Sequence, residues 1–179
     1  DKGSLGDDNL TNLANNLTIS GSTSEDGGTV RLYDWVDANN DTFVDDTELT
    51  ELVTVAPAAG AFSADIALSE GEHKIVARHE DSAGNLSDAS AALTITVDLT
   101  APTAPGVALN SDSGSSSGDE VTNDNKVNVT GLETGASWEY SLNGGSSWNP
   151  GSGSSFDMAS NTVYAAGQIQ VRQTDAAGN

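Results

Sequence analysis

Apolar and polar residues alternate with a period of two along several short stretches of the chain. The clearest stretches are residues 29–34, 73–79, 92–98, 106–110, 126–131, 137–142 and 168–173. They are also rich in β-branched and aromatic residues, and both features are typical of half-buried β-strands. Since no window shows a helical period, the pattern predicts an all-β fold.

The turns between these stretches are polar and rich in glycine. Asn143-Gly144 follows the stretch 137–142, and both residues tolerate the positive φ of a tight hairpin turn. The sequence therefore predicts a hairpin closed at these two residues.

Two segments recur along the chain and define a repeat. RHEDSAGN at 78–85 returns as RQTDAAGN at 172–179, 94 positions later, and DKGSLGDDNLTN at 1–12 returns loosely as DSGSSSGDEVTN at 112–123. A repeat of about 100 residues has the size of an immunoglobulin-like sandwich.

The boundary between the copies falls at VDLTAPTAP, residues 97–105, where two prolines favour an extended connection. The sequence thus predicts two tandem immunoglobulin-like β-sandwich domains, residues 1–99 and 100–179. Compared strand by strand, the first copy lacks its first strand and the second copy lacks its last.

The stretch DANNDTFVDDTE, residues 37–48, has the oxygen spacing of an EF-hand calcium loop, placed between two strands as a hairpin insertion. Side-chain oxygens occupy positions 1, 3, 5, 9 and 12, and a backbone carbonyl is offered at position 7; these residues are Asp37, Asn39, Asp41, Asp45, Glu48 and Phe43. The alternative is a solvated acidic loop. Position 6, normally glycine, is Thr42, whose β-branched side chain resists positive φ at a cost of roughly 1 kcal/mol.

A second candidate calcium site lies at the domain junction. Immunoglobulin-like topology turns the DAAGN segment toward the linker, so the expected ligands there are Asp98, Thr100, Asp175 and Asn179, with Asp1, Asp7 and Asp8 in the loop between the first two strands of copy one. Asp81 and Asn85 would act in the same way toward a preceding domain, and Asp112, Asp119 and Asp124 toward a following one. The alternative for both segments is a plain turn in which the aspartate caps backbone amides.

The charge and the composition of the chain exclude several classes of binding partner. The chain has 27 acidic and 6 basic residues, a formal net charge of −21, and no cysteine. Nucleic acid and anionic membranes would be repelled, and cations are the natural partners. The longest nearly apolar run, residues 52–62, is about half of the ~20 residues that a membrane span requires, so no membrane insertion is expected.

Nothing in the sequence indicates an enzyme. His73 and His79 lie about 20 Å apart on one strand at ~3.3 Å per residue and cannot share a metal, and no serine-histidine-acid order or HExxH motif occurs. Trp138 and Tyr140 share one strand face and are expected in the core rather than stacked on a sugar. Trp35, at the edge of the acidic loop, is the better candidate for an exposed aromatic.

Residues 100–179 resemble the bacterial immunoglobulin-like repeats of giant repeats-in-toxin adhesins and biofilm-associated surface proteins. The resemblance rests on SDSGSSSGDEVTNDNKVNVTG, SWEYSLNGGSSW and YAAGQIQVRQTDAAGN in this order. Residues 1–99, with SGS as a turn at 20–22, EGEHKIVARHEDSAGN and VDLTAP, look like a more divergent member.

The resemblance implies a monomeric spacer, secreted to the bacterial cell surface and stiffened by calcium where it contacts adjacent immunoglobulin-like domains of the same chain. The alternative is a calcium-dependent module for a glycan or peptide ligand, presented by Trp35 and the loop 37–48.

Overall fold

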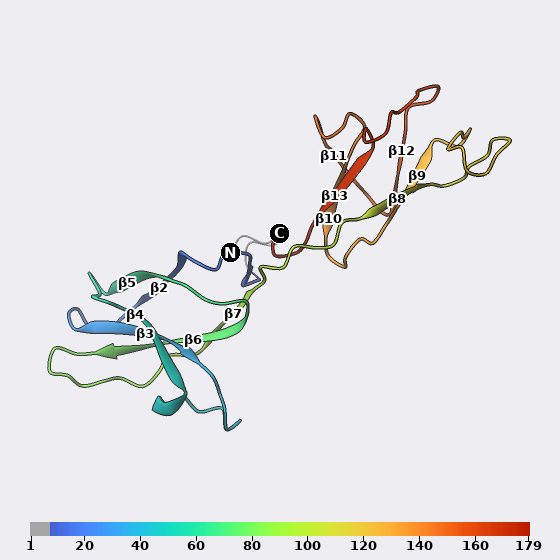
Figure 1. Cartoon of the computed structure of the whole chain (residues 1–179). Coiled ribbons are helices and arrows are strands. Elements are labelled where there is room, and N and C mark those ends of the chain that lie inside the picture. Colours follow the sequence, from blue (N-terminus) through green and yellow to red (C-terminus); the bar gives the residue numbers. More distant parts are fainter. Residues whose placement is uncertain (1–7) are drawn as a thin grey trace. The chain divides into compact units, whose positions relative to one another are not determined.

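The computed structural model describes residues 8–179, and the chain divides into two compact units, residues 1–99 and 100–179. Within the described residues, all regular elements are strands except one short 3-10 turn (Figure 1). The all-β fold expected from the alternation is confirmed. No helix in this part of the chain has the length and apolar character needed to cross a bilayer.

The first unit contains a five-stranded and a two-stranded sheet. The larger sheet has the order β1 (Leu10–Thr11), β7 (Leu93–Val97), β6 (Gly71–Glu80), β3 (Thr29–Trp35), β4 (Leu49–Val55), and the smaller pairs β2 (Leu17–Ser22) with β5 (Ala61–Ile66). All neighbours are antiparallel except β1 and β7, which run parallel. The two-residue strand β1 therefore stands at the edge of the copy that was expected to lack its first strand.

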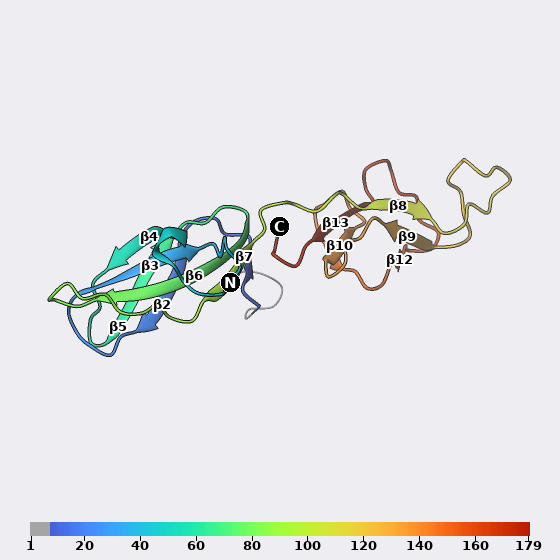
Figure 2. The same cartoon turned by 90° about the horizontal axis from the view of Figure 1, so that it is seen from below.

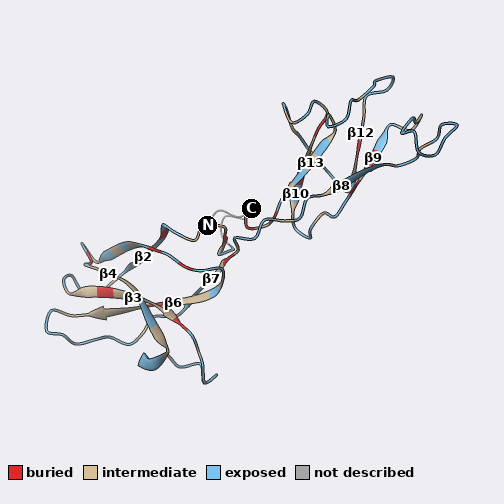
Figure 3. Cartoon of the chain, in the orientation of Figure 1, coloured by how far each residue is buried: buried red, intermediate tan, exposed pale blue. Residues whose placement is uncertain are grey.

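Alternate residues of these strands form the core of the first unit. Val30 and Leu32 of β3 are 1% exposed, and they pack in one cluster with Ile75 of β6 and Val97 of β7. In Figure 3, buried residues interrupt the strands, and exposed residues occur on the strands as well as in the loops. This period-two burial explains why the alternation in the sequence located the strands.

The second unit contains two three-stranded sheets. One has the order β11 (Asn149–Pro150), β10 (Ser137–Ser141), β13 (Gln170–Thr174), and the other β12 (Ser155–Asp157), β9 (Lys126–Thr130), β8 (Gly106–Leu109). Figure 1 labels all six strands, and Figure 2 shows β8, β9 and β12 from another direction. No strand follows β13 within residues 175–179.

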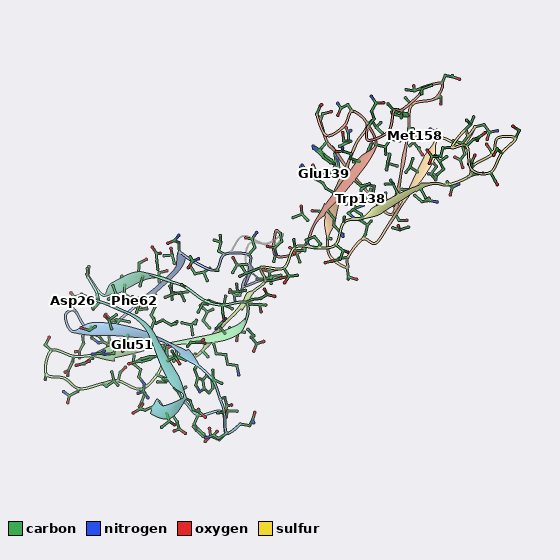
Figure 4. All side chains as sticks on the ribbon, in the orientation of Figure 1. Asp26, Glu51, Phe62, Trp138, Glu139 and Met158 are labelled. Atoms are coloured by element: carbon green, nitrogen blue, oxygen red, sulfur yellow. The ribbon has the colours of Figure 1, made fainter. Side chains whose placement is uncertain are left out.

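Aromatic residues dominate the core of the second unit. Trp138 is 6% exposed and packs with Phe156, and Tyr140 stacks on Phe156 with 4.2 Å between ring centroids. Trp138 and Glu139 are consecutive residues on opposite faces of β10 (Figure 4). The expected core position of Trp138 and Tyr140 agrees with this packing.

One local prediction was wrong, and a second was confirmed only in part, because the expected hairpin is present between β10 and β11 but its turn differs from the expected one. The SGS segment at 20–22 is the end of β2 rather than a turn, and Gly21 lies under the ring of Phe62, where a Cβ atom would come within 2.6 Å of the ring. The turn after β10 takes its positive φ values at Gly144 and Gly145, whereas Asn143 is not in the positive-φ region. Asn143 instead accepts the backbone N–H of Ser147 through Oδ1 at 2.9 Å.

Candidate functional site

The acidic loop 37–48 connects β3 to β4 and projects beyond the ends of these strands (Figure 1). Its last three residues form the 3-10 turn η1 (Asp46–Glu48). The N–H of Val36 donates to the carbonyl of Glu48 at 3.1 Å, which closes the loop at its base. The two strands therefore anchor the loop in place of the helices of an EF-hand.

The first half of the loop is folded by its own side-chain oxygens. Asp37 accepts the N–H of Asp41 at 3.2 Å through Oδ1 and the N–H of Thr42 at 3.3 Å through Oδ2. Asn39 Oδ1 accepts the N–H of Asp41 at 2.9 Å, and Asp41 Oδ1 accepts the N–H of Phe43 at 2.8 Å. The oxygens at positions 1, 3 and 5 are thus fixed on the inside of one turn.

Thr42 at position 6 has a φ of 66°, in the left-handed region. The turn therefore has the backbone conformation for which EF-hand loops use glycine, although a β-branched residue occupies the position. An L-residue with a branched Cβ is strained there by roughly 1–2 kcal/mol.

The side chains at positions 3, 5 and 9 meet at the centre of the loop. Asn39 Nδ2 donates to Asp41 Oδ2 at 3.1 Å and to Asp45 Oδ2 at 3.4 Å. One amide group therefore separates two carboxylates that would otherwise repel each other.

Glu48, at position 12, holds the two ends of the loop together. Its Oε1 accepts the N–H groups of Ala38 at 2.9 Å and Asn39 at 3.3 Å, and its Oε2 accepts Nε1 of Trp35 at 3.2 Å. A carboxylate oxygen has two lone-pair directions, so an oxygen with a single donor retains one for another partner.

Trp35 is not the exposed aromatic that the sequence suggested. The residue is only 9% exposed, its Nε1 is bonded to Glu48, and Lys74 Nζ lies 5.2 Å from the ring centroid. The prediction was wrong because Glu48 at the end of the loop and Lys74 of β6 both pack against Trp35, and these contacts are not visible in the sequence. The exposed aromatic of the loop is Phe43, at 72%.

A second contact fixes η1 to the sheet. Arg78 of β6 donates from Nη1 to Asp46 Oδ1 at 2.5 Å, and the Arg78 side chain is only 14% exposed. The end of the loop is therefore anchored to β6 as well as to β3 and β4.

Within residues 8–179, no three His, Cys, Asp or Glu side chains are gathered closely enough to hold a metal ion by themselves. In the loop, the carboxylates are occupied by loop N–H groups, and the EF-hand ligand set also needs the Asn39 amide oxygen and the Phe43 carbonyl. The donors fit calcium in type and in order along the chain. To coordinate an ion, these oxygens would have to move closer together than they are in this structure.

The two Asp-x-Ala-Gly-Asn segments form the same turn in both units. Asp81 Oδ1 accepts the N–H groups of Ala83 and Asn85, each at 2.8 Å, and Asp81 Oδ2 accepts Asn85 Nδ2 at 2.8 Å. The side-chain and backbone hydrogen bonds from Asn85 hold the pKa of the Asp81 carboxyl below its usual value. This is the plain capped turn that the sequence offered as an alternative.

Asp175 repeats these contacts in a buried setting. Its Oδ1 accepts the N–H groups of Gly178 and Asn179, each at 2.8 Å, and its Oδ2 accepts Asn179 Nδ2 at 3.0 Å. Burial raises the pKa of the Asp175 carboxyl, but the hydrogen bonds from Asn179 and the turn amides outweigh it, so the pKa lies below the usual value. Asp175 is 9% exposed.

Strand register shows at which end of its own unit each turn lies. In the first unit, Gly71 at the start of β6 pairs with Val97, so the Asp81 turn after β6 is at the end opposite residue 97. In the second unit, the chain enters through Gly106, which pairs with Thr130 at the end of β9. The next strand, β10, begins at Ser137, and Ser137 pairs with Thr174. The Asp175 turn therefore lies at the end of the second unit where the chain enters.

The junction residues belong to different units. Asp98 is in the first unit, where its N–H donates to the carbonyl of Thr11 at 2.9 Å, while Thr100, Asp175 and Asn179 are in the second. A calcium site shared by both units stays a prediction. Asp8 precedes β1 and accepts the N–H of Leu10 at 3.1 Å, so it does not lie between the first two strands. Asp1 and Asp7 fall outside the described residues.

The remaining acidic triplet caps its own loop. Asp112 Oδ2 accepts the N–H of Glu120 at 3.2 Å, Asp119 Oδ1 accepts that of Val121 at 3.1 Å, and Asp124 Oδ2 accepts Asn110 Nδ2 at 2.8 Å. The Asn110 amide, together with the N–H of Lys126, lowers the pKa of the Asp124 carboxyl.

Asp34, His73 and Ser69 lie together in the first unit, although no serine-histidine-acid order is visible in the sequence. His73 Nδ1 is 2.7 Å from Asp34 Oδ2, and His73 Nε2 is 3.4 Å from Ser69 Oγ but only 3.0 Å from the Ser69 carbonyl oxygen. Both nearest partners, the Asp34 carboxylate and the Ser69 carbonyl, only accept hydrogen bonds, so the ring nitrogen that lies nearest the Ser69 carbonyl donates to it. A histidine that donates from Nε2 cannot take a proton from the serine hydroxyl.

A protein-family profile for the bacterial Ig-like domain matches residues 1–99, and the chain belongs to this family. The match covers the copy that looked more divergent in sequence. A comparison with curated protein sequences gave no match. The family is typically a non-catalytic structural module and is often found in surface proteins, so the fold class and the family together indicate a surface-protein extender module.

Proposed function

We propose that the chain is a calcium-rigidified spacer in a large bacterial cell-surface adhesin of the repeats-in-toxin or biofilm-associated type. The observation that carries the calcium part is the loop 37–48. Its oxygens at positions 1, 3 and 5 follow an EF-hand order around a left-handed residue 42.

Electrostatics supports the need for a cation. Five acidic residues fall within the twelve positions of the loop, in a chain whose formal net charge is −21. Bound calcium would lower the repulsion among them and would add oxygen coordination to the hydrogen bonds and the Arg78–Asp46 ion pair that hold the loop. The Asp175 turn, at the end of the second unit where the chain enters, is the second place for an ion.

In this mechanism calcium stiffens each module and its junction, so that an array of modules holds a distal binding domain away from the cell. The partners are the adjacent immunoglobulin-like domains of the same chain, the chain is monomeric and secreted, and no residue acts as a catalyst.

The test compares thermal unfolding and small-angle scattering of the full chain with calcium and with a chelator. Because calcium binds only the folded loop, free calcium at 100 times its dissociation constant would stabilise the native state by about 2.7 kcal/mol. We expect a higher unfolding temperature and less conformational spread with calcium.

Asp41→Asn, which removes one charge with little change of shape, should reduce the calcium effect. Asp88→Asn, the same change on an exposed segment outside the candidate sites, should not. Identical unfolding with and without calcium in the unmodified chain would exclude the mechanism.

The alternative, a calcium-dependent glycan or peptide module, has one observation in its favour. Phe43 is 72% exposed at the loop and Val36, at its base, is 62% exposed, so the loop presents apolar surface. A glycan array probed with the calcium-loaded chain separates the two functions, since selective binding that is lost in Phe43→Ser would favour the module.

A further inference from the structure

Gln173 lies near the end of β13, two positions before Asp175, and its side chain reaches the segment by which the chain enters the second unit. Its Nε2 donates to the carbonyl oxygen of Thr103 at 2.6 Å and to that of Gly131 at 3.0 Å. Thr103 is part of the linker 97–105 that the prolines define.

Two more hydrogen bonds close a ring through the same residues. The N–H of Glu133 donates to Gln173 Oε1 at 2.9 Å, and the N–H of Thr103 donates to Glu133 Oε1 at 3.2 Å. Thr103, Glu133 and Gln173 are therefore each bonded to the other two.

The chemistry of this position is specific for an amide. A primary amide offers two N–H donors and one carbonyl acceptor, and Gln173 uses all three. A glutamate of the same shape would place a second acceptor against two carbonyl oxygens, and it would add a charge close to Glu133.

The first unit provides an internal comparison. His79 occupies the corresponding position of the repeat, and its Nε2 lies 2.8 Å from the carbonyl oxygen of Gly27, in the loop before β3. Gly131 lies in the corresponding loop before β10. The bond to this loop is therefore common to both units, and the second donor of Gln173 is the one that holds the linker.

We propose that Gln173 is a linker-positioning residue, which locks Thr103 onto the second unit without any metal ion. Asp98 is bonded to Thr11 within the first unit, and residues 99–102, one of which is a proline, connect it to Thr103. This inference rests on the proposed spacer function, and it assigns part of the stiffness of the spacer to a hydrogen-bonded ring rather than to calcium.

The test uses the full chain in the presence of a chelator, with amide hydrogen exchange at Thr103 and 15N relaxation of residues 99–104 as readouts. Gln173→Glu should speed exchange at Thr103 by about tenfold or more, because local opening controls exchange of such an amide. Gln170→Glu is the matched control on the same strand, because Gln170 Nε2 bonds only the nearby Gly167 carbonyl at 3.1 Å.

Gln173→His separates positioning from stability. It copies the first unit, so we expect it to keep the bond to Gly131 and the unfolding temperature while still releasing Thr103. Faster exchange confined to Thr103 and its neighbours supports the proposal. Unchanged exchange at Thr103, or equal acceleration at core amides such as Val129, would overturn it.

Because all samples contain chelator, the result is independent of calcium. A chain that shows no calcium effect but releases Thr103 in Gln173→His would exclude the calcium mechanism and leave the linker lock standing.

Discussion

Thr42 donates its backbone N–H to Oδ2 of Asp37 at 3.3 Å while its own φ is 66°. The hydrogen bond needs this left-handed conformation, which a β-branched residue adopts only at a cost. Thr42→Gly should therefore stabilise the loop by roughly 1 kcal/mol and raise its calcium affinity. Chemical unfolding would measure the change in stability, and calorimetric titration with calcium would measure the change in affinity.

Thr47→Gly is the control for this change. Thr47 lies in η1 and does not have a positive φ, so glycine there should destabilise the first unit slightly through its greater freedom in the unfolded chain. A loss of stability in Thr42→Gly as well would show that strain at residue 42 is unimportant.

Trp35 should report on ion binding to the loop. Its Nε1 is bonded to Glu48 Oε2, and an ion that takes the Glu48 carboxylate as a ligand would weaken this bond. We expect tryptophan fluorescence to change during a calcium titration. The change should disappear in Trp35→Phe and persist in Trp148→Phe, whereas persistence in both variants would place the ion elsewhere.

Asp175 should make the second unit less stable in acid. A carboxyl whose folded pKa lies below its unfolded value of about 3.9 stabilises the native state above that value, and the contribution is lost as the pH falls through the folded pKa. The free energy of unfolding should therefore drop as the pH falls from 5 toward and below the folded pKa. Unfolding curves recorded at a series of pH values measure this drop.

In Asp175→Asn, this part of the pH dependence should be absent and the stability at neutral pH should be lower. Asp157→Asn, on an exposed residue of β12, should leave the acid response of the second unit close to that of the unmodified chain. Equal acid responses in all three proteins would contradict the role of Asp175.

Gly151 should be intolerant of any side chain. A Cβ atom at this position would lie 2.2 Å from Cδ2 and Cε2 of the buried Trp138 ring. Gly151→Ala should therefore destabilise the second unit by about 1–3 kcal/mol, the usual cost of overpacking. Gly118→Ala, where nothing lies within 4 Å, should have almost no effect in the same thermal unfolding experiment.

Several strands were predictable because burial imposes its period of two on their sequence. β3, β6 and β9 place one face in the core, and the alternation of Val30 and Leu32 with polar neighbours makes this visible. β2 and β5 also alternate, but small residues such as Gly21 and Ala64 stand among their positions, so the apolar signal of these two strands is weak.

The donor types and their order in the loop 37–48 were also present in the sequence, because coordination by a short loop is a matter of local spacing. The conformation of Thr42 followed from the same spacing. The burial of Trp35 did not, because it depends on Lys74 and Glu48, which approach the ring only when β6 and η1 pack beside it.

The sequence by itself determined the all-β fold and the repeat, since the alternation of apolar and polar residues and the recurring segments can both be read directly along the chain. Only the tertiary structure revealed the Asp34–His73 contact and the ring of Thr103, Glu133 and Gln173. These contacts join residues 30 to 70 positions apart. No local pattern records such distant contacts, because strand pairing and loop packing bring their partners together.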